Sequence, residues 1–355
     1  MPPWSVLPAI SNTSKANWQT YPCLHTHDSI LMHKRLLILL LLLPLTHLRA
    51  QDIHFSQVDA NPLLLNPAYA GFYNGAGRFG VIYRNQWASV STPFQTFALT
   101  GEMAVWRDNQ SLSGFSAGAS IFNDHAGSLH YGTTSAHLSL AYYHALNRHR
   151  NNFLSLGIEG GFAQSGFDPT HAEMEDPSEL FPTQHSNYPL LAAGLAWYWQ
   201  PNGDLHTKVG LSVRNINQPN ISYLGLDDTY LLRRYSLFAR AEYRYWQTWS
   251  LMPVMLLQLQ GKYHELVYGV DFKWYLDEGS RHQISLRAGL AYRHGDALIA
   301  NLLMEYDAFL FNFCYDANIS GLATASNTIG AFEIGMVYRL SKGEKKTKAL
   351  KCQPY

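Results

Sequence analysis

The chain has 355 residues, of which 26 are basic and 26 are acidic, so its formal net charge is zero. This balance excludes nucleic acid as an expected partner, because nucleic-acid-binding proteins need a basic surface. Charged residues make up only 15% of the chain and aromatic residues 14%, whereas about a quarter of a soluble domain is charged. An aromatic-rich chain with no apolar run of about 18 residues after position 50 is typical of an outer-membrane β-barrel.

The first fifty residues contain a predicted secretory signal peptide at 32–50. A basic start at Met32–Arg35 precedes an apolar run at Leu36–Leu43, and Ala50 offers a small residue for cleavage. This order of segments is that of a signal peptide and not of a membrane anchor. Since the signal begins at position 32, we expect residues 1–31 to be a mis-called extension.

The segment 51–76 differs from everything that follows it. It contains two Asn-Pro steps, Asn61-Pro62 and Asn66-Pro67, which disfavour helix before each proline and mark turns. The segment is apolar enough to pack against another part of the protein but too short to be a domain. It is either a lead-in to the first strand or a plug or latch, and we expect a latch docked at the periplasmic end of the barrel.

From position 77 onward, apolar and polar residues alternate. Successive side chains of a strand point to opposite faces, so alternation predicts strands with one apolar and one polar face. In 328–340, Phe332, Ile334 and Met336 share one face, while Glu333 and Arg339 share the other. A soluble sandwich would alternate too, but the number of copies and the leader favour an all-β transmembrane barrel at 77–341 with about fourteen antiparallel strands. The predicted strands are 77–89, 94–106, 113–124, 130–145, 153–165, 188–200, 205–214, 232–246, 250–262, 265–276, 281–293, 297–307, 309–319 and 327–341.

The predicted connections have two sizes, which suits an outer-membrane barrel with short turns on one rim and long loops on the other. The loop 167–187 is acidic, and we expect it to be extracellular or a cap. The tail 342–355 carries five lysines and is expected to be solvated. The long connections are 167–187 and 215–231, and the short ones include 109–111, 147–152, 201–204, 277–280 and 294–296.

Charges on the polar faces are expected to point into the barrel lumen, because a charge on the lipid face costs about 2–4 kcal/mol at the midplane of the membrane. They either close the lumen through arginine–carboxylate pairs or line a channel for anionic solutes. Their mixed signs favour the closed lumen. The predicted lumen charges are Arg84, Arg240, Arg244, Arg287, Glu333 and Arg339, together with Lys208, Arg214, Asp271, Lys273 and Arg293.

No catalytic constellation stands out. An esterase site would need a serine and a histidine, but the candidates are irregularly spaced and no GxSxG motif occurs. Neither metal-ligand spacing nor a phosphate-binding glycine loop is present, so we expect no enzyme, cofactor or metal. A disulfide between Cys314 and Cys352 is chemically allowed in an oxidising compartment, but nothing in the sequence brings these two cysteines together. The esterase candidates are His125, His130, His137 and His144 with Ser128, Ser135 and Ser139.

The opening of the predicted mature chain resembles the PorP/SprF family of the type IX secretion and gliding-motility apparatus of Bacteroidetes-type bacteria. Tyr83–Trp87 is similar to the first-strand signature of that family, and 332–339 is similar to its closing strand. The ending departs from the family pattern, since Gln353 separates Cys352 from Pro354. The matching opening residues are Gln51-Asp52, Phe55-Ser56-Gln57, Asn61-Pro62-Leu63, Leu65-Asn66-Pro67-Ala68 and Ala70-Gly71.

This resemblance implies a non-enzymatic outer-membrane barrel that works with the periplasmic ring and the peptidoglycan-linked components of the secretion system. It also implies docking of a secreted adhesin or other cargo with a matching C-terminal domain. The alternatives are a solute-conducting porin and an outer-membrane lipid hydrolase. The residues that the resemblance marks as partner-binding are Phe55, Ser56, Gln57, Asn61, Pro62, Leu65, Asn66, Pro67, Ala70 and Gly71.

Overall fold

The computed structural model describes a barrel and two short stretches that precede it. The predicted extension, signal peptide, acidic loop interior and C-terminal tail, as well as Ser128, His130 and Cys352, lie outside the described residues. The chain separates into two units, Met1–Arg49 and Ala50–Tyr355, and every described residue belongs to the second. The described residues are 55–57, 61–73, 75–89, 92–108, 113–127, 131–147, 149, 151–167, 185–223, 229–246, 248–277, 282–321 and 323–340.

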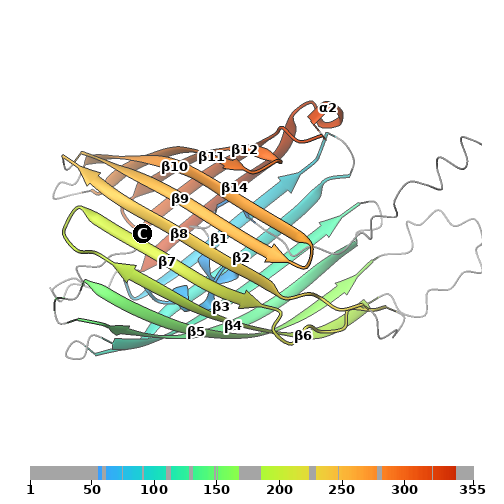
Figure 1. Ribbon diagram of the computed structural model, residues 1–355, viewed down its shortest axis with the longest axis horizontal. Helices are drawn as coiled ribbons and strands as arrows, with labels where there is room; N and C mark the ends of the chain where they lie inside the picture. Colours follow the sequence, from blue (N-terminus) through green and yellow to red (C-terminus); the bar gives the residue numbers. More distant parts are fainter. Residues whose placement is uncertain are drawn as a thin grey trace, which may run out of the picture. The chain divides into compact units, whose positions relative to one another are not determined.

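Fourteen antiparallel strands close into a barrel within the described part of the chain (Figure 1). Each strand pairs with its neighbours in sequence, and β1 pairs with β14 to complete the cylinder. The predicted barrel is confirmed, and each strand end lies within three residues of its predicted position. The strands are β1 (Gly77–Gln86), β2 (Phe94–Asp108), β3 (Ser113–Ala126), β4 (Tyr131–Ala145), β5 (Asn152–Gly166), β6 (His185–Trp199), β7 (Leu205–Arg214), β8 (Arg234–Tyr245), β9 (Trp249–Gln260), β10 (Tyr263–Asp277), β11 (Ile284–Arg293), β12 (Ala297–Tyr306), β13 (Phe309–Asn318) and β14 (Ile329–Leu340).

The barrel wall is apolar outside and polar inside. On β4, Leu138 and Leu140 expose 70% and 57% of their surface, while His137 and Ser139 beside them are buried. A soluble protein shows the opposite distribution, and this one is that of an outer-membrane barrel. A register slip of one residue would turn the charged face outward, so the alternation fixes the register. Among the described residues, no helix has the length and apolar character needed to cross a membrane.

The two rims of the barrel differ in the length of their connections. The rim where β1 begins and β14 ends carries connections of at most six residues, and we call it the turn rim. The opposite rim, the loop rim, carries the connections 167–184 and 215–233, and 319–328 with the short helix α2 (Ala323–Ser326). The predicted short turn 294–296 also lies on the loop rim, because it joins β11 to β12. Turn length alone therefore misplaced that turn.

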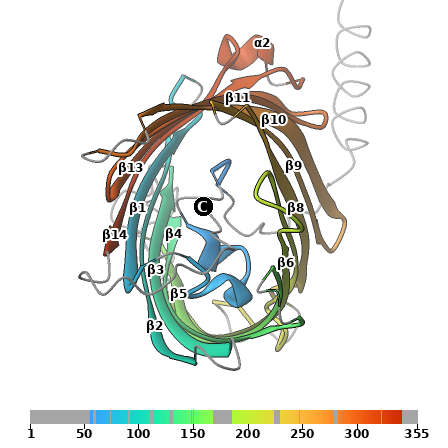
Figure 2. The same cartoon turned by 90° about the vertical axis from the view of Figure 1, so that its left-hand side faces the viewer.

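The N-terminal segment lies inside the barrel (Figure 2). We call its described residues, 55–57 and 61–73, the plug. Two 3-10 turns, η1 (Pro62–Leu64) and η2 (Pro67–Tyr69), follow the two Asn-Pro steps. The largest buried apolar cluster joins the plug to the wall, since Tyr69 and Phe72 pack on Phe153 and Tyr198. The hydrophobic core thus sits in the lumen, around the plug.

Candidate functional site: an occupied barrel lumen

The wall holds the plug through hydrogen bonds to plug carbonyl groups. Ser212 Oγ donates to the Leu65 carbonyl at 2.7 Å, and Ser155 Oγ donates to the Ala68 carbonyl at 2.7 Å. Arg214 Nη1 donates to the Leu63 carbonyl at 3.3 Å. An irregular backbone inside a barrel needs such partners, because an unpaired buried carbonyl costs free energy comparable to a lost hydrogen bond. These wall residues come from β5 and β7, so the plug is held from neighbouring parts of the cylinder.

Glycines in the wall provide the room that the plug occupies. A Cβ atom at Gly157 would lie 2.3 Å from the Ala68 nitrogen, and one at Gly210 would lie 2.1 Å from the Tyr69 hydroxyl. Both distances are too short for non-bonded contact. The strands therefore approach the plug more closely than any residue with a side chain permits, which is the reason for interior strand glycines here.

Asn66 attaches the plug to two strands at once. Its side-chain Nδ2 donates to the carbonyl groups of Leu195 on β6 and Leu211 on β7, each at 3.0 Å. Its Oδ1 accepts from the Ala68 N–H at 2.9 Å and caps η2. Leu195 and Leu211 are directly opposite each other in the ladder. The second Asn-Pro step is therefore both a turn signal and a bridge to the wall.

Ser56 lies in a buried cluster of charges on β1, β11, β13 and β14. The Ser56 N–H donates to Glu333 Oε1 at 2.7 Å, and the Gln57 N–H donates to Glu333 Oε2 at 3.0 Å. Arg84 bonds to Glu333 and reaches Asp316 at 3.1 Å. Arg293 adds hydrogen bonds to the Ser56 hydroxyl at 2.7 Å and to Asp316 at 3.1 Å. We call these wall residues, together with Glu265 (2.9 Å from Arg293), the Ser56 cluster.

Two guanidinium groups face three carboxylates in the Ser56 cluster. The excess of negative charge is stabilised by the two backbone N–H donors of the plug, since hydrogen bonds to a charged acceptor are roughly twice as strong as neutral ones. Glu333 is 0% exposed, so water cannot replace these donors without opening the site. The plug therefore completes the charge cluster, and the cluster in turn holds the plug.

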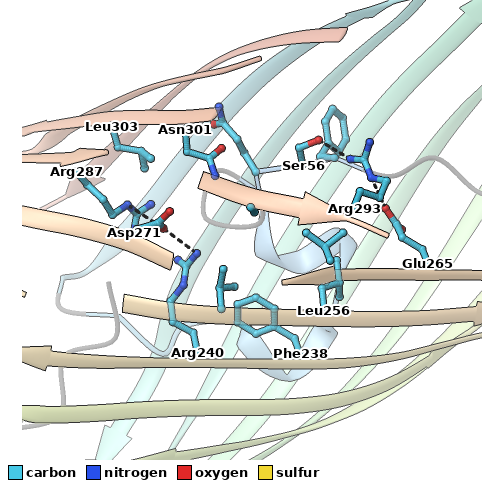
Figure 3. A pocket seen from close by; sticks show the side chains of 15 residues that line it. Ser56, Phe238, Arg240, Leu256, Glu265, Asp271, Arg287, Arg293, Asn301 and Leu303 are labelled. Carbon is cyan, nitrogen blue, oxygen red and sulfur yellow. Dashed lines mark hydrogen bonds and ion pairs between the residues drawn. The ribbon is translucent and has the colours of Figure 1, made fainter. Parts of the chain in front are cut away.

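A small chamber remains between the plug and the β8–β12 wall (Figure 3). Phe238 and Leu256 lie between two groups of charged side chains, with Arg240, Asp271 and Arg287 on one side and Glu265 and Arg293 on the other. The free volume is about 40 Å³, which is room for one to a few water molecules. Both amide atoms of Gln57 and Oδ1 of Asp271 point to no partner among the described residues and suit such water. The chamber is too small for a solute to pass.

One comparison assigns the chain. The sequence profile of the family described as "Type IX secretion system membrane protein PorP/SprF" matches residues 48–338. The chain belongs to the PorP/SprF family. It is a membrane protein of the type IX secretion system, and its closed barrel with an apolar exterior places it in the outer membrane. By the usual pattern of such barrels, the turn rim of this PorP/SprF protein faces the periplasm and the loop rim the exterior.

Solved structures with a similar fold are outer-membrane channels. The CymD monoaromatic hydrocarbon channel is 10% identical with a TM-score of 0.45, over 81% of this chain and 94% of that chain. The Ralstonia pickettii toluene transporter TbuX is 10% identical with a TM-score of 0.45, over 78% and 93%. A mutant of the TodX monoaromatic hydrocarbon channel is 9% identical with a TM-score of 0.47, over 78% and 93%. Likeness at this level carries no argument about function. No curated protein matches the chain.

The plug of this PorP/SprF protein reaches further through the lumen than the latch that the sequence predicts. Near the turn rim, the Gly71 N–H donates to Glu102 at 2.7 Å. Ser56 lies toward the opposite rim, because its partner Arg293 ends β11 and pairs with Asp296 in the turn that follows. The plug thus passes through the lumen and is not docked only at the periplasmic end.

The proposed partner-binding residues lie against the barrel's own wall. Their placement gives them contacts within the chain, and binding to another protein stays a prediction. Phe55 packs against the apolar cluster that contains Ile82, and Ser56 accepts a hydrogen bond from Arg84 at 3.1 Å. Buried or nearly buried in the lumen are Phe55, Ser56, Gln57, Asn61, Pro62, Leu65, Asn66, Pro67, Ala70 and Gly71.

The predicted lumen charges pair within the wall. Arg240 and Arg287 share Asp271, at 3.4 and 3.8 Å. Arg339 lies 3.7 Å from Glu305. The guanidinium of Arg244 stacks on Tyr275 with its carbon 4.1 Å from the ring centroid, and Arg84 bonds to Glu333 in the Ser56 cluster. Sequence reasoning missed several acidic partners, namely Glu102, Glu159, Glu265 and Asp316, although their positions on polar faces were a usable signal.

Two of the esterase candidates do meet in space. Ser135 Oγ lies 2.7 Å from His137 Nε2, and His137 Nδ1 lies 3.1 Å from Glu159 Oε1. This order of groups is that of a serine–histidine–acid relay. Ser135 is only 2% exposed, however, and the neighbouring 30 Å³ cavity is lined by His137 but not by Ser135. Arg214 also binds Glu159. The chain of bonds links β4, β5 and β7 and offers a substrate no access to the hydroxyl.

Proposed function

We propose that this PorP/SprF protein is a non-enzymatic docking subunit of the type IX secretion system. In this role it docks a secreted adhesin or other cargo carrying a C-terminal domain. It also links that cargo to the periplasmic ring and to the peptidoglycan-linked components. The family supplies the secretion system, and the occupied lumen supports docking over conduction.

The plug is the observation that carries this proposal. A porin needs a water-filled passage, as large barrels with open lumens have. Here the lumen holds the plug, and the chamber between the plug and the β8–β12 wall has a free volume of about 40 Å³. Wall charges face one another across salt bridges and do not line a solvated path. A barrel closed in this way presents its rims as the surfaces available to partners.

Planar-bilayer recording separates docking from conduction. Purified full-length protein is expected to insert without a steady open-pore current. Heat-modifiable mobility on a gel serves as the control that the inserted barrel is folded. A steady current through the unmodified protein would favour the porin and overturn the proposal.

Photo-crosslinking from the two rims tests where partners bind. Gly203 lies in a turn-rim connection and Gly321 in a loop-rim connection, and a Cβ at either position meets nothing within 4 Å. A photoreactive residue fits at both sites without disturbing the wall. The proposal expects the periplasmic ring to crosslink from Gly203 and the cargo to crosslink from Gly321. Crosslinks to neither class of partner, with the barrel folded, would contradict it.

A further inference from the structure

The charges that face the lumen from β7–β14 are distributed unevenly between the two rims. Among the described side chains in the half of these strands next to the loop rim, basic and acidic residues balance: Arg214, Arg234 and Arg293 against Glu265, Asp316 and Glu333. In the half next to the turn rim the acidic residues are Glu242, Asp271 and Glu305. Six basic residues face them there, and we call this half of the lumen the basic mouth. They are Lys208, Arg240, Arg244, Lys273, Arg287 and Arg339.

The sequences of the connecting segments follow the same division. The loop-rim connection 167–184 contains five acidic residues and neither lysine nor arginine. The turn-rim connections between strands contain three basic and three acidic residues, so they do not offset the basic mouth. The tail that follows β14 at the turn rim adds five lysines and one glutamate. A chain with no net charge is therefore positive toward its turn rim.

The basic mouth is accessible from the turn rim. Arg339 lies one residue before the end of β14, and its side chain is 28% exposed. Arg240 lies deeper in the lumen, and its side chain is still 15% exposed. The plug turn η2 packs on β4, β5 and β6, none of which carries a residue of the basic mouth (Figure 2). The plug thus occupies a different part of the lumen wall at this level.

The excess of positive charge attracts anions to the basic mouth. Six basic residues against three acidic ones leave an excess of three. Arg240 and Arg287 share the single carboxylate of Asp271, and Lys208 lies 3.6 Å from the ring centroid of Tyr69. A ring face attracts a cation but does not cancel its charge. A recess lined by an excess of one sign of charge concentrates ligands of the opposite sign.

We propose that the basic mouth binds an acidic segment of a periplasmic protein. The turn rim faces the periplasm, so the ligand comes from that side. The basic side chains point into the lumen, so the headgroups of the lipids around the outer wall do not reach them. Guanidinium groups bind carboxylates through paired hydrogen bonds. This inference deepens the proposed function, because it gives the chemistry of the partner that docks at the turn rim.

The depth of the basic mouth favours a chain of carboxylates over a single small anion. Arg244 and Arg240 are four residues apart on β8, which is about 13 Å along a strand. A phosphate or chloride ion neutralises charge at one of these levels only. An extended segment places the side chains of one face about 7 Å apart. Two or three acidic residues at alternate positions therefore reach both levels.

Fluorescence anisotropy of a fluorescein-labelled hexaglutamate peptide tests this binding. The full-length protein is purified in an uncharged detergent, and we expect one peptide to bind per barrel at low salt. Arg244→Gln should raise the Kd by about tenfold, because one hydrogen-bonded charge pair is lost. Arg233→Gln is the matched control and should leave the Kd unchanged. It removes the same charge at the opposite, loop-rim end of β8, where Arg233 is exposed.

Competition experiments separate the acidic segment from other occupants. Unlabelled hexaglutamate should displace the labelled peptide at a lower concentration than a six-residue oligogalacturonate or inorganic phosphate does. Equal or better displacement by the sugar or by phosphate would overturn the inference. Binding that occurs only after residues 342–355 are removed would assign the basic mouth to the tail of the chain itself. An equal Kd for Arg244→Gln and Arg233→Gln would also refute the site.

A photoreactive hexaglutamate keeps the inference testable if Arg244→Gln does not fold. On the wild-type barrel it should crosslink to the turn-rim halves of β7–β14, and crosslinks confined to the loop rim would count against the basic mouth. Heat-modifiable gel mobility shows that each protein is folded. If the periplasmic ring crosslinks from Gly203 while hexaglutamate does not bind, the docking role stands and only this inference fails.

Discussion

Replacing Glu333 by glutamine tests whether the Ser56 cluster holds the plug. Glu333 accepts the N–H groups of Ser56 and Gln57 and bonds to Arg84, and it is 0% exposed. Glutamine keeps the size of the side chain but turns one acceptor into a donor that faces another donor. The ion pair with Arg84 lies within the wall, so the part of the change that bears on the plug is the loss of a hydrogen bond to a charged group, about 1.5–3 kcal/mol. The equilibrium for plug release should therefore rise by about 10–10²-fold.

The thiol of Cys314 reports release of the plug. Cys314 is 0% exposed on the lumen face of β13, and its sulfur lies 3.6 Å from Asp316 Oδ1 in the Ser56 cluster. In a background in which Cys23 and Cys352 are serine, the rate of labelling by N-ethylmaleimide measures the fraction of barrels with an open cluster. Glu333→Gln should accelerate labelling in proportion to that fraction.

Glu305→Gln is the matched control for this assay. Glu305 is also a lumen carboxylate, but its ion partners Lys273 and Arg339 both belong to the wall. Its loss should perturb the wall locally and leave the labelling of Cys314 slow. If Glu333→Gln labels no faster than Glu305→Gln while both barrels remain folded, the plug is held by other contacts and the reasoning is refuted.

Three further predictions follow from the geometry. Gly210→Ala should destabilise the barrel by about 1–3 kcal/mol, because the added methyl group overpacks against the plug. The control Gly160→Ala should not, because a Cβ at Gly160 meets nothing within 4 Å. The temperature at which half of each variant shifts to the unfolded band on a gel compares their stabilities. Ester hydrolysis should be absent from the wild type and unchanged in Ser135→Ala, because the hydroxyl is buried; turnover abolished by that variant would restore the hydrolase. At the turn rim, the hydrogen bond from His282 lowers the pKa of Asp307 below 3.8. Because the pKa of Asp307 is lowered in the folded protein, the contact stabilises the fold above pH 3.8, and this stabilisation is lost as the pH falls through the lowered pKa. His282→Ala should therefore raise the pKa of Asp307, which the chemical shift of its carboxyl carbon reports.

The strands of this protein could be predicted from its sequence because their side chains face two different media. Lipid accepts Leu138 and Ile334, and the lumen accepts Glu333, so the alternation records the environment of every residue on a strand. Strand ends were found to within three residues for the same reason, since the alternation stops where the membrane ends. The turn at 294–296 could not be assigned to a rim by its length, because either rim accepts a short turn.

The position of the plug could not be predicted from local patterns. Asn66-Pro67 indicates a turn, but nothing in the sequence shows that the Asn66 amide bonds to strands 129 and 145 residues away. The pairing of Glu333 with Ser56 spans 277 residues and likewise leaves no local signal. Polar-face carboxylates such as Glu159 were visible in the alternation, yet which arginine each one meets depends on the stagger of the closed barrel.

The plug also explains why the lumen of this barrel carries so many buried charges. A lumen filled with water would hydrate them, but protein fills this one, so each charge needs a partner of its own. The plug supplies backbone N–H donors at both ends of its course, to Glu333 toward the loop rim and to Glu102 near the turn rim. Removal of the plug would take these donors from Glu333 and Glu102 and leave each carboxylate with its arginine partner in the wall, Arg84 and Arg78, so the plug strengthens charge pairs that the wall already contains.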